Sequence, residues 1–155
     1  MKKLPAQFSD WFATRGWSIH DHQQQMLDKA DATALLLIAP TGGGKTLAGF
    51  LPSLIDLAAS PRQGLHTIYI SPLKALAADI KRNLSTPVTE MDLPVRIEER
   101  TGDTPSSRKR RQRADPPHIL LTTPESLALL ISYEDAPRIF AGLQRIVIDE
   151  IHALA

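Results

Sequence analysis

The sequence predicts an α/β fold in which a parallel β-sheet is flanked by helices. Five apolar runs of strand length, rich in Ile, Leu or Val, occupy residues 35–40, 67–72, 95–100, 119–124 and 145–150. Stretches with the apolar spacing of helices lie between several of these runs. Strands that alternate with helices form right-handed βαβ units, whose sheet is parallel and buried on both faces.

Helical spacing follows three of the five runs. Apolar residues three and four positions apart begin at Leu47, at Leu73 and at Leu127. In parallel sheets of this kind, ligands bind at the carboxyl ends of the strands. The polar residues directly after each run are therefore the candidates for binding and catalysis.

The composition excludes several classes of protein. A chain of 155 residues forms one domain or part of a larger one, and 43% hydrophobic with 23% charged residues is typical of a globular domain. The absence of cysteine excludes disulfides, thiolate metal sites and a cysteine nucleophile. A net charge of +1 gives no overall field for nucleic acid.

The N-terminal segment MKKLPAQFSDWF has no apolar stretch after its two lysines, so it does not read as a secretion signal. The uncharged apolar runs are also too short to span a bilayer. We therefore expect a soluble, cytoplasmic protein without a membrane partner.

A glycine-rich turn, APTGGGKT at residues 39–46, follows the first apolar run and precedes a helical pattern, which is the context of a P-loop. Glycines let successive backbone N–H groups surround an anion. The expected nucleotide-binding residues of this turn are Thr41, Gly42, Gly43, Gly44, Lys45 and Thr46. Lys45 would reach the β- and γ-phosphates of ATP, and the Thr46 hydroxyl would bind Mg²⁺. Ala39 stands where the strict pattern has glycine, and a strand-to-helix turn without a ligand is the alternative.

Two adjacent carboxylates, Asp149 and Glu150, end the last apolar run. Asp149 would face the Mg²⁺ ion held by Thr46, and Glu150 would orient and deprotonate the water that attacks the γ-phosphate. The alternative is a pair of N-capping acids on the next helix. Because the glycine-rich turn lies roughly 100 residues upstream, the pair favours an ATPase.

The connection at residues 101–117 carries most of the local positive charge. Residues 95–115 contain seven basic and four acidic residues, and the basic cluster comprises Arg108, Lys109, Arg110, Arg111 and Arg113. This cluster has two interpretations. It is the solvated face of a short surface helix that begins at Ser106 or Ser107, or it is a patch that contacts phosphates of any sequence and releases them at high salt.

The motifs together resemble those of superfamily 2 helicases. APTGGGKT begins at Ala39, SPLKAL at Ser71, TTPES at Thr122 and DEIH at Asp149, in the order found in that family. The segment RTGDT at residues 100–104 makes the chain most similar to the Lhr-like group. The opening LPAQFSDWFATRGW and His22-Gln23 resemble the ligase-associated DExH-box helicases.

The resemblance implies a RecA-like P-loop NTPase. Residues 1–33 would form an N-terminal helical segment with a glutamine motif that reads adenine, and residues 34–155 the first RecA-like ATP-binding domain. The implied activity is ATP-driven translocation on single-stranded or partly duplex DNA and its unwinding, in the 3′-to-5′ direction and in DNA repair. RNA is not excluded as a substrate. An ATP-dependent DNA ligase and a nuclease are the implied partners.

The resemblance also assigns individual residues. Gln23 matches the adenine-reading glutamine, although Gln24 and Gln25 adjoin it, and Lys45, Asp149 and Glu150 match catalytic positions. The positions that match nucleic-acid contacts are Ser71, Pro72, Lys74, Gly102, Asp103, Thr123, Pro124 and Glu125. Their alternative is turn and helix-cap chemistry. His152 matches the histidine that links the nucleotide to the nucleic-acid site, and a structural histidine is the alternative. Apart from the resemblance, Trp11 and Trp17 could stack on bases, but at the N-terminus we expect them to pack Leu4, Phe8 and Phe12 against the domain.

In the resembling family, a second lobe supplies arginine fingers, and the strand after the DExH box lies between the P-loop strand and the DExH strand. We therefore interpret the sequence as an N-terminal fragment with a gap in its sheet. Since an arginine finger contributes about 10³ to 10⁵ in rate, the chain alone would be a weak nucleotide binder. The other function classes are a P-loop kinase or small-molecule NTPase and a non-catalytic nucleic-acid-binding fragment.

Overall fold

A computed structural model describes residues 1–40, 42 and 44–154, and it has the three layers of an α/β fold. The sheet contains β1 (Thr67–Ile70), β2 (Ile97–Arg100), β3 (Ile119–Thr122) and β4 (Arg145–Ile148). The strand order is β2-β3-β1-β4, and every neighbouring pair is parallel. The predicted fold class is confirmed, and four of the five predicted strands are present.

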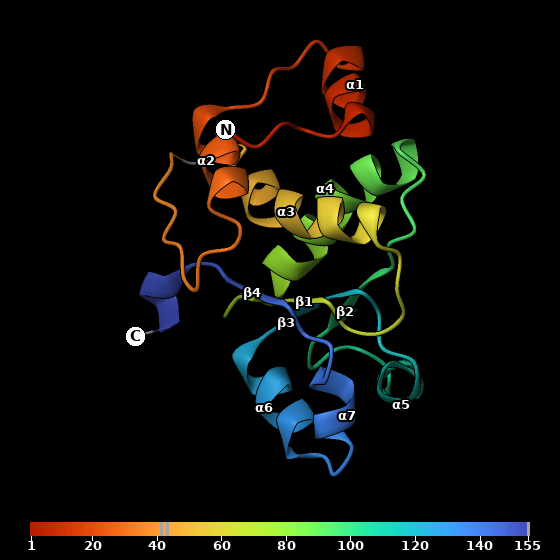
Figure 1. The fold of residues 1–155 in the computed structure, drawn as a ribbon. Coiled ribbons are helices and arrows are strands. Elements are labelled where there is room, and N and C mark those ends of the chain that lie inside the picture. The colour runs from red at the N-terminus through yellow and green to blue at the C-terminus, as the bar shows by residue number, and fades with distance from the viewer. Residues whose placement is uncertain (41, 43, 155) are drawn as a thin grey trace.

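Helices cover both faces of the sheet (Figure 1). One face is covered by α3 (Lys45–Ala59) and α4 (Lys74–Glu90), over which lie α1 (Ala6–Thr14) and α2 (Asp21–Asp28). The opposite face is covered by α6 (Pro124–Ser132) and α7 (Ala136–Phe140). The last two elements are α5 (Ser106–Ala114), beside β2, and the 3₁₀ helix η1 (Ile151–Leu154), after β4.

Strand alternation divides the core between the two faces. Tyr69 of β1 and Leu121 of β3 belong to the cluster that contains Phe50 of α3, whereas Ile68 and Leu120 belong to the opposite cluster. The first cluster also includes Phe8, Trp11 and Phe12 of α1. The N-terminal segment is therefore part of the main core. Trp17, by contrast, stays 53% exposed.

The prediction of a strand at residues 35–40 is wrong for this structure. The segment has no regular secondary structure, and Leu36 and Ile38 are 73% and 86% exposed. A cavity of about 270 Å³, lined by residues 34–37 and 144–149, separates it from β4. Backbone groups of an extended segment form a strand only when a neighbour pairs with them, and the edge strand β4 does not pair with residues 34–37 across this cavity. The cavity lies where the resemblance implies a further strand.

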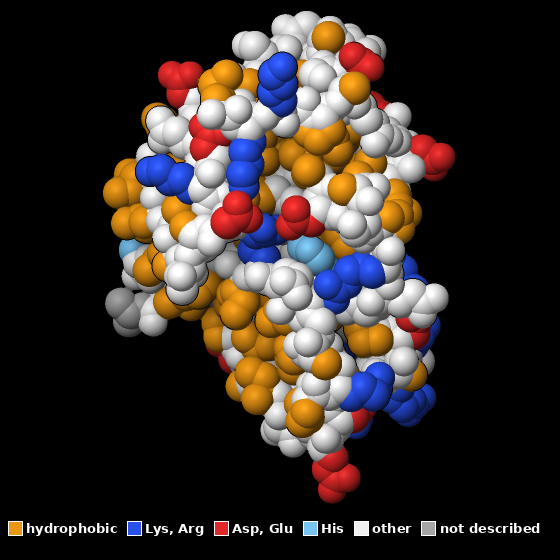
Figure 2. Space-filling view, in the orientation of Figure 1, with side chains coloured by type: hydrophobic (Ala, Val, Ile, Leu, Met, Phe, Trp, Pro, Cys, Tyr) orange, Lys and Arg blue, Asp and Glu red, His pale blue; other side chains and the backbone are white. Residues whose placement is uncertain are grey.

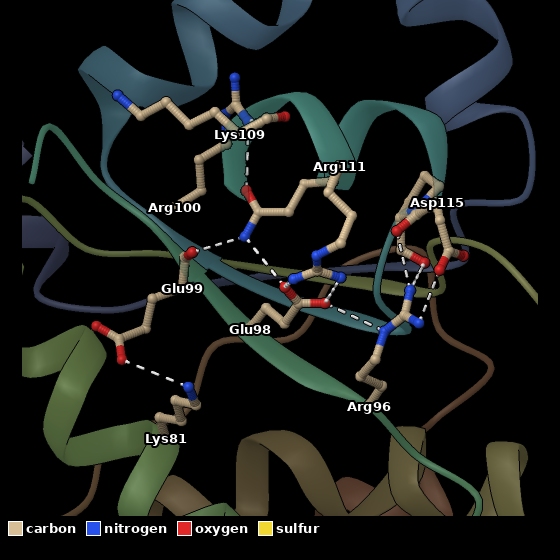
Figure 3. A network of polar contacts seen from close by, with 10 residues as sticks. Lys81, Arg96, Glu98, Glu99, Arg100, Lys109, Arg111 and Asp115 are labelled. Carbon is tan, nitrogen blue, oxygen red and sulfur yellow. Dashed lines mark hydrogen bonds and ion pairs between the residues drawn. The ribbon is translucent and has the colours of Figure 1, made fainter. Parts of the chain in front are cut away.

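The other edge of the sheet is covered by α5 (Figure 3). Gln112 donates from Nε2 to the backbone oxygen of Glu99 over 2.9 Å, which is the kind of bond a neighbouring strand would make. Arg111 pairs with the carboxylate of Glu98, and Arg100 donates to the backbone oxygen of Lys109 over 3.0 Å. These bonds fix α5 against β2 and protect its edge.

The carboxyl group of Glu98 is the centre of this network. Burial raises its pKa, but hydrogen bonds from Arg111 and Gln112 and the charges of Arg111 and Arg96 outweigh burial, so the net pKa is lowered. A carboxylate with a lowered folded-state pKa stabilises the fold above the pKa of the unfolded chain, which is about 4.3 for Glu. That stabilisation is lost as the pH falls through the folded-state pKa.

Replacing Glu98 by Gln should lower the free energy of unfolding at pH 7 by about 1–2 kcal/mol, because Arg111 loses a charged acceptor. The difference from the parent should shrink as the pH falls below about 4. Urea unfolding at both pH values measures it. Glu99→Gln is the matched control, since within the described chain the carboxylate of Glu99 has only a 3.9 Å contact with Lys81, and the change should alter stability by less than about 0.5 kcal/mol. Equal losses in the two variants would contradict this account of the α5 contact.

Candidate functional site

All four strands end at one edge of the sheet because they are parallel. The residues just after neighbouring strands are joined through the backbone there. Asp149 donates its N–H to the oxygen of Ile70 over 3.0 Å, and Ser71 donates to the oxygen of Thr122 over 3.1 Å. The polar loops after β1, β3 and β4 are therefore held side by side.

The glycine-rich turn is anchored at its last glycine by Gln23. Gly44 has a left-handed φ of 71° and caps α3, and its backbone oxygen accepts a bond from Gln23 Nε2 over 3.1 Å. The Gln23 side-chain oxygen accepts from the N–H of His20 over 2.9 Å. Among the described residues, these two bonds occupy one N–H and one lone pair of the buried amide, and its second N–H and second lone pair have no hydrogen-bond partner. Gln24, in contrast, donates to Lys2 and Asp28, away from the turn.

The end of the turn and the acidic pair border the same space. Lys45, Thr46 and Asp149 line both the cavity beside β4 and a second cavity of about 750 Å³. The second cavity is also lined by Gly42, Gly44 and Glu150 and, farther along, by Gln23 and Trp17. Two segments roughly 100 residues apart in sequence thus face one open volume. The predicted residues Thr41 and Gly43 lie outside the described part of the chain.

The Asp149 carboxylate is held by two donors. The Tyr69 hydroxyl donates to its Oδ2 over 2.9 Å, and the N–H of Glu150 donates to its Oδ1 over 2.9 Å. Burial, together with the bond to Asp149 and its charge, raises the pKa of Tyr69, so the hydroxyl remains a donor. Tyr69 was missed by the sequence analysis. The available signal was a single tyrosine inside the aliphatic run TIYI, but its partner depends on the pairing of β1 with β4.

Glu150 turns the chain sharply after β4. It has a left-handed φ of 53°, a conformation that costs energy for a residue with a side chain. His152, in η1, brings its Nε2 to 3.1 Å from the Glu150 carboxylate. Glu150 and His152 are therefore in direct contact, while the His152 ring remains largely exposed.

The candidate nucleic-acid residues fall into two groups. Ser71 and Thr123 are buried and bond to the backbone N–H groups of Leu73 and Ser126, as turn and cap residues do. The exposed members are Lys74, Gly102, Asp103 and Glu125, and Pro72 and Pro124 are half-buried. Lys74 Nζ lies 3.4 Å from both carboxylate oxygens of Asp103, so the loops after β1 and β2 meet in front of β3.

Comparison with known proteins identifies relatives among the helicases. A model of the DEAD/DEAH box helicase family matches residues 20–155. The "ATP-dependent helicase Lhr-Core" of Methanocaldococcus jannaschii is 34% identical in a match 161 positions long that covers 94% of this chain and 19% of the relative. The "Lhr helicase/uracil glycosylase" of Escherichia coli is 37% identical in a match 178 positions long that covers 98% of this chain and 11% of the relative. The chain thus spans less than a fifth of the length of either relative.

Solved structures agree with the sequence comparison. The helicase Lhr of Mycobacterium smegmatis, bound to ssDNA and AMP-PNP, superposes with a TM-score of 0.86 at 39% identity, covering 97% of this chain and 20% of that one. The DUF1998 helicase MrfA, bound to DNA and AMPPNP, superposes with a TM-score of 0.86 at 28% identity, covering 99% of this chain and 22% of that one.

Replacing Gly44 by Ala tests the link between the turn and Gln23. A Cβ there would lie 2.7 Å from Gln23 Nε2, and the left-handed φ adds its own cost. We expect the free energy of unfolding to fall by about 2–3 kcal/mol, from about 1–2 kcal/mol of backbone strain and about 1 kcal/mol of lost hydrogen bond. Thermal or urea unfolding measures it.

Gly16→Ala is the matched control, because Gly16 has a φ of 67° but no atom within 4 Å of the added Cβ. The free energy of unfolding should fall by about 1 kcal/mol less in Gly16→Ala than in Gly44→Ala, because no hydrogen bond is lost. If the two variants lose the same stability, Gln23 does not anchor the turn.

Proposed function

The chain belongs to the DEAD/DEAH box helicase family, and we propose that it binds and hydrolyses ATP as part of a DNA helicase of the Lhr type. The observation that carries the proposal is the shared cavity lining of Lys45, Thr46 and Asp149. A triphosphate needs backbone amides and a cation on one side and a metal-binding carboxylate on the other. These groups face one volume that is open to solvent.

Each part of the nucleotide has a proposed partner. The triphosphate binds the glycine-rich turn at residues 41–46, where Lys45 neutralises the β- and γ-phosphates. The adenine lies toward Gln23, which lines the same cavity and whose amide has one donor and one acceptor without a partner in the described part of the chain. Trp17, which is half-exposed on that cavity wall, offers an aromatic surface on the same side.

The donor set fits Mg²⁺. This ion uses one or two protein oxygens and completes its octahedron with phosphate oxygens and waters. Thr46 and Asp149 supply oxygens on the shared cavity, and the described residues contain no cluster of three His, Cys, Asp or Glu side chains that would form a full protein cage. When bound, the ion neutralises charge on the phosphates. Tyr69 and the N–H of Glu150 fix the orientation of the Asp149 carboxylate.

Glu150 is the proposed general base for the water that attacks the γ-phosphate. Its carboxylate follows Asp149 directly and lines the larger cavity with Lys45 and Thr46. His152 contacts this carboxylate and is the proposed link to the nucleic-acid site. A general base contributes about 10²- to 10⁴-fold to the rate of hydrolysis. Its removal should therefore slow hydrolysis while leaving nucleotide binding in place.

The proposed nucleic-acid substrate is single-stranded or partly duplex DNA. The exposed loops with Lys74, Gly102–Asp103 and Glu125 lie at one edge of the sheet, and two of the solved relatives are described as bound to ssDNA or DNA. Loop contacts to the backbone position a strand without reading its sequence. No helix in the described part of the chain is both long and apolar enough to cross a membrane.

The resemblance to ligase-associated helicases extends the proposal to DNA repair in the cytoplasm, with an ATP-dependent ligase and a nuclease as partners. A P-loop kinase would hydrolyse or transfer phosphate without responding to DNA. A non-catalytic DNA-binding protein would bind DNA equally well after Lys45→Ala.

In the intact enzyme, Lys45→Ala should abolish binding of a fluorescent ATP analogue, because the phosphates lose their only lysine partner in the glycine-rich turn. Lys29→Ala, which removes the same charge from an exposed position, should leave binding unchanged. Glu150→Gln in the intact enzyme should retain binding but slow DNA-stimulated ATP turnover by about 10²-fold or more. Turnover at the parental rate in Glu150→Gln would show that the base is elsewhere.

Tyr69→Phe should raise the Mg²⁺ concentration that nucleotide binding requires, without removing the fold. The ring still packs on Phe50, whereas Asp149 loses the hydroxyl that orients it. Loss of such an orienting partner typically lowers metal affinity about 10- to 100-fold. A Mg²⁺ titration of analogue binding measures it, and nucleotide affinity without Mg²⁺ should stay constant. An unchanged Mg²⁺ midpoint would remove Asp149 from the proposed metal site.

A further inference from the structure

The five cations of the cluster at residues 108–113 divide into two groups. Arg111 pairs with Glu98, and Arg113 donates to Asp135 over 3.0 Å while its guanidinium lies 3.7 Å from the centre of the Tyr133 ring. These two arginines attach α5 to the rest of the domain. The three others are free of such contacts. Across the described residues, no carboxylate lies within 4.0 Å of the side-chain nitrogens of Arg108, Lys109 and Arg110, which we call the basic surface of α5.

The carboxylates nearest in sequence are already engaged. Asp103 is paired with Lys74, and Asp115 accepts from Arg96 over 2.9 Å. Residues 104–114 contain no Asp or Glu. The surface helix expected from Ser106 is present. Arg111 and Arg113 attach it to the domain, while the basic surface carries three positive charges without a carboxylate partner among the described residues.

The basic surface is presented on a rigid element. Arg100, almost fully buried beneath α5, donates to the backbone oxygen of Lys109, and Gln112 is bonded to Glu99. In Figure 3 the Lys109 side chain leads away from this network, and no hydrogen bond or ion pair joins its amino group to the residues drawn. Figure 2 shows Lys and Arg side chains gathered at the lower right, where α5 lies in Figure 1. Cations on a fixed helix lose less entropy on binding than cations on a mobile loop.

The strand order gives the position of this surface relative to the candidate nucleic-acid loops. Neighbouring strands lie about 4.8 Å apart, and the order β1, β3, β2 places Lys74, then Thr123–Glu125, then Gly102–Asp103 in one row. Helix α5 begins at Ser106, directly after the last of these loops. The basic surface occupies the half of α5 that follows this loop, so it continues the row beyond the edge of the sheet.

We propose that the basic surface of α5 binds the phosphate backbone of the same nucleic-acid strand that crosses the loops after β1, β3 and β2. The proposal rests on the proposed function, because it needs a strand on those loops. Contacts of this kind neutralise phosphates and release counterions, so they add affinity that depends on salt and not on sequence.

The test compares the double variant Arg108→Ala/Arg110→Ala with the control Lys3→Ala/Lys29→Ala. Each double variant removes two exposed cations that form no ion pair with the described residues, but Lys3 and Lys29 lie on the N-terminal segment. Binding of a fluorescent oligothymidylate of about 16 nucleotides is measured by anisotropy across a salt series. Each phosphate contact on a single strand contributes about 0.7 to the slope of log K against log salt. Loss of two contacts should therefore reduce the magnitude of this slope by about 1.4 in the α5 variant, and the control should keep the parental slope.

Two further measurements make the outcomes distinct. Unfolding and ATP-analogue binding should be unchanged in the α5 variant, because neither arginine contacts the core or the cavities. If the α5 variant keeps the parental slope while Lys74→Ala reduces it, the proposal for the basic surface is overturned, and the proposed binding of nucleic acid to the loops after β1, β3 and β2 stands. If the parent does not bind the oligonucleotide at all, both proposals fail.

An acidic protein is the competing partner for three free cations. Polyglutamate of matched charge serves as its probe. If the α5 substitutions weaken polyglutamate binding but leave oligothymidylate binding and its salt slope unchanged, the surface binds an acidic polypeptide and the nucleic-acid proposal is overturned.

Discussion

The parallel alignment of the four strands is the constraint on which the site depends. Because every strand runs in the same direction, each apolar run delivers its following polar residues to the same edge of the sheet. The pairing of β1 with β4 then brings Tyr69 under Asp149, and the packing of α3 on that face brings Lys45 and Thr46 to the same cavity. An antiparallel β4 would place the acidic pair at the opposite edge, far from the glycine-rich turn.

The two edges of the sheet are treated differently. At β2, the side chains of α5 bond to the exposed strand and its carboxylates, so the edge is closed within the chain. At β4, a cavity separates the strand from residues 34–37, and apolar side chains on both sides face solvent, among them Ile146 and Ile38. The same apolar pattern therefore forms a strand where a neighbour is present and remains irregular where none pairs with it.

Sequence patterns predicted most of this structure because they report local physics. The runs at 67–72, 95–100, 119–124 and 145–150 became strands, and the segment before Lys45 leads directly into a helix as the glycine-rich turn requires. The run at 35–40 failed because strand formation depends on a partner, which no local pattern encodes. Three contacts were missed for the same reason. They are the bond from Tyr69 to Asp149, the bond from the Gln23 amide to Gly44, and the ion pairs that Arg111 and Arg113, unlike the rest of the basic cluster, form with carboxylates. Each depends on contacts between segments distant in sequence.

The central claim is that one Mg²⁺–triphosphate is held between the first turn of α3 and the acidic end of β4. A crystal structure with Mn²⁺ and a non-hydrolysable ATP analogue tests it most directly, since the anomalous signal locates the ion. The account predicts an ion bound at about 2.1–2.2 Å by the Thr46 hydroxyl and phosphate oxygens, with Asp149 bound directly or through one water. A nucleotide outside this cavity, or an ion that contacts neither Thr46 nor Asp149, would contradict it.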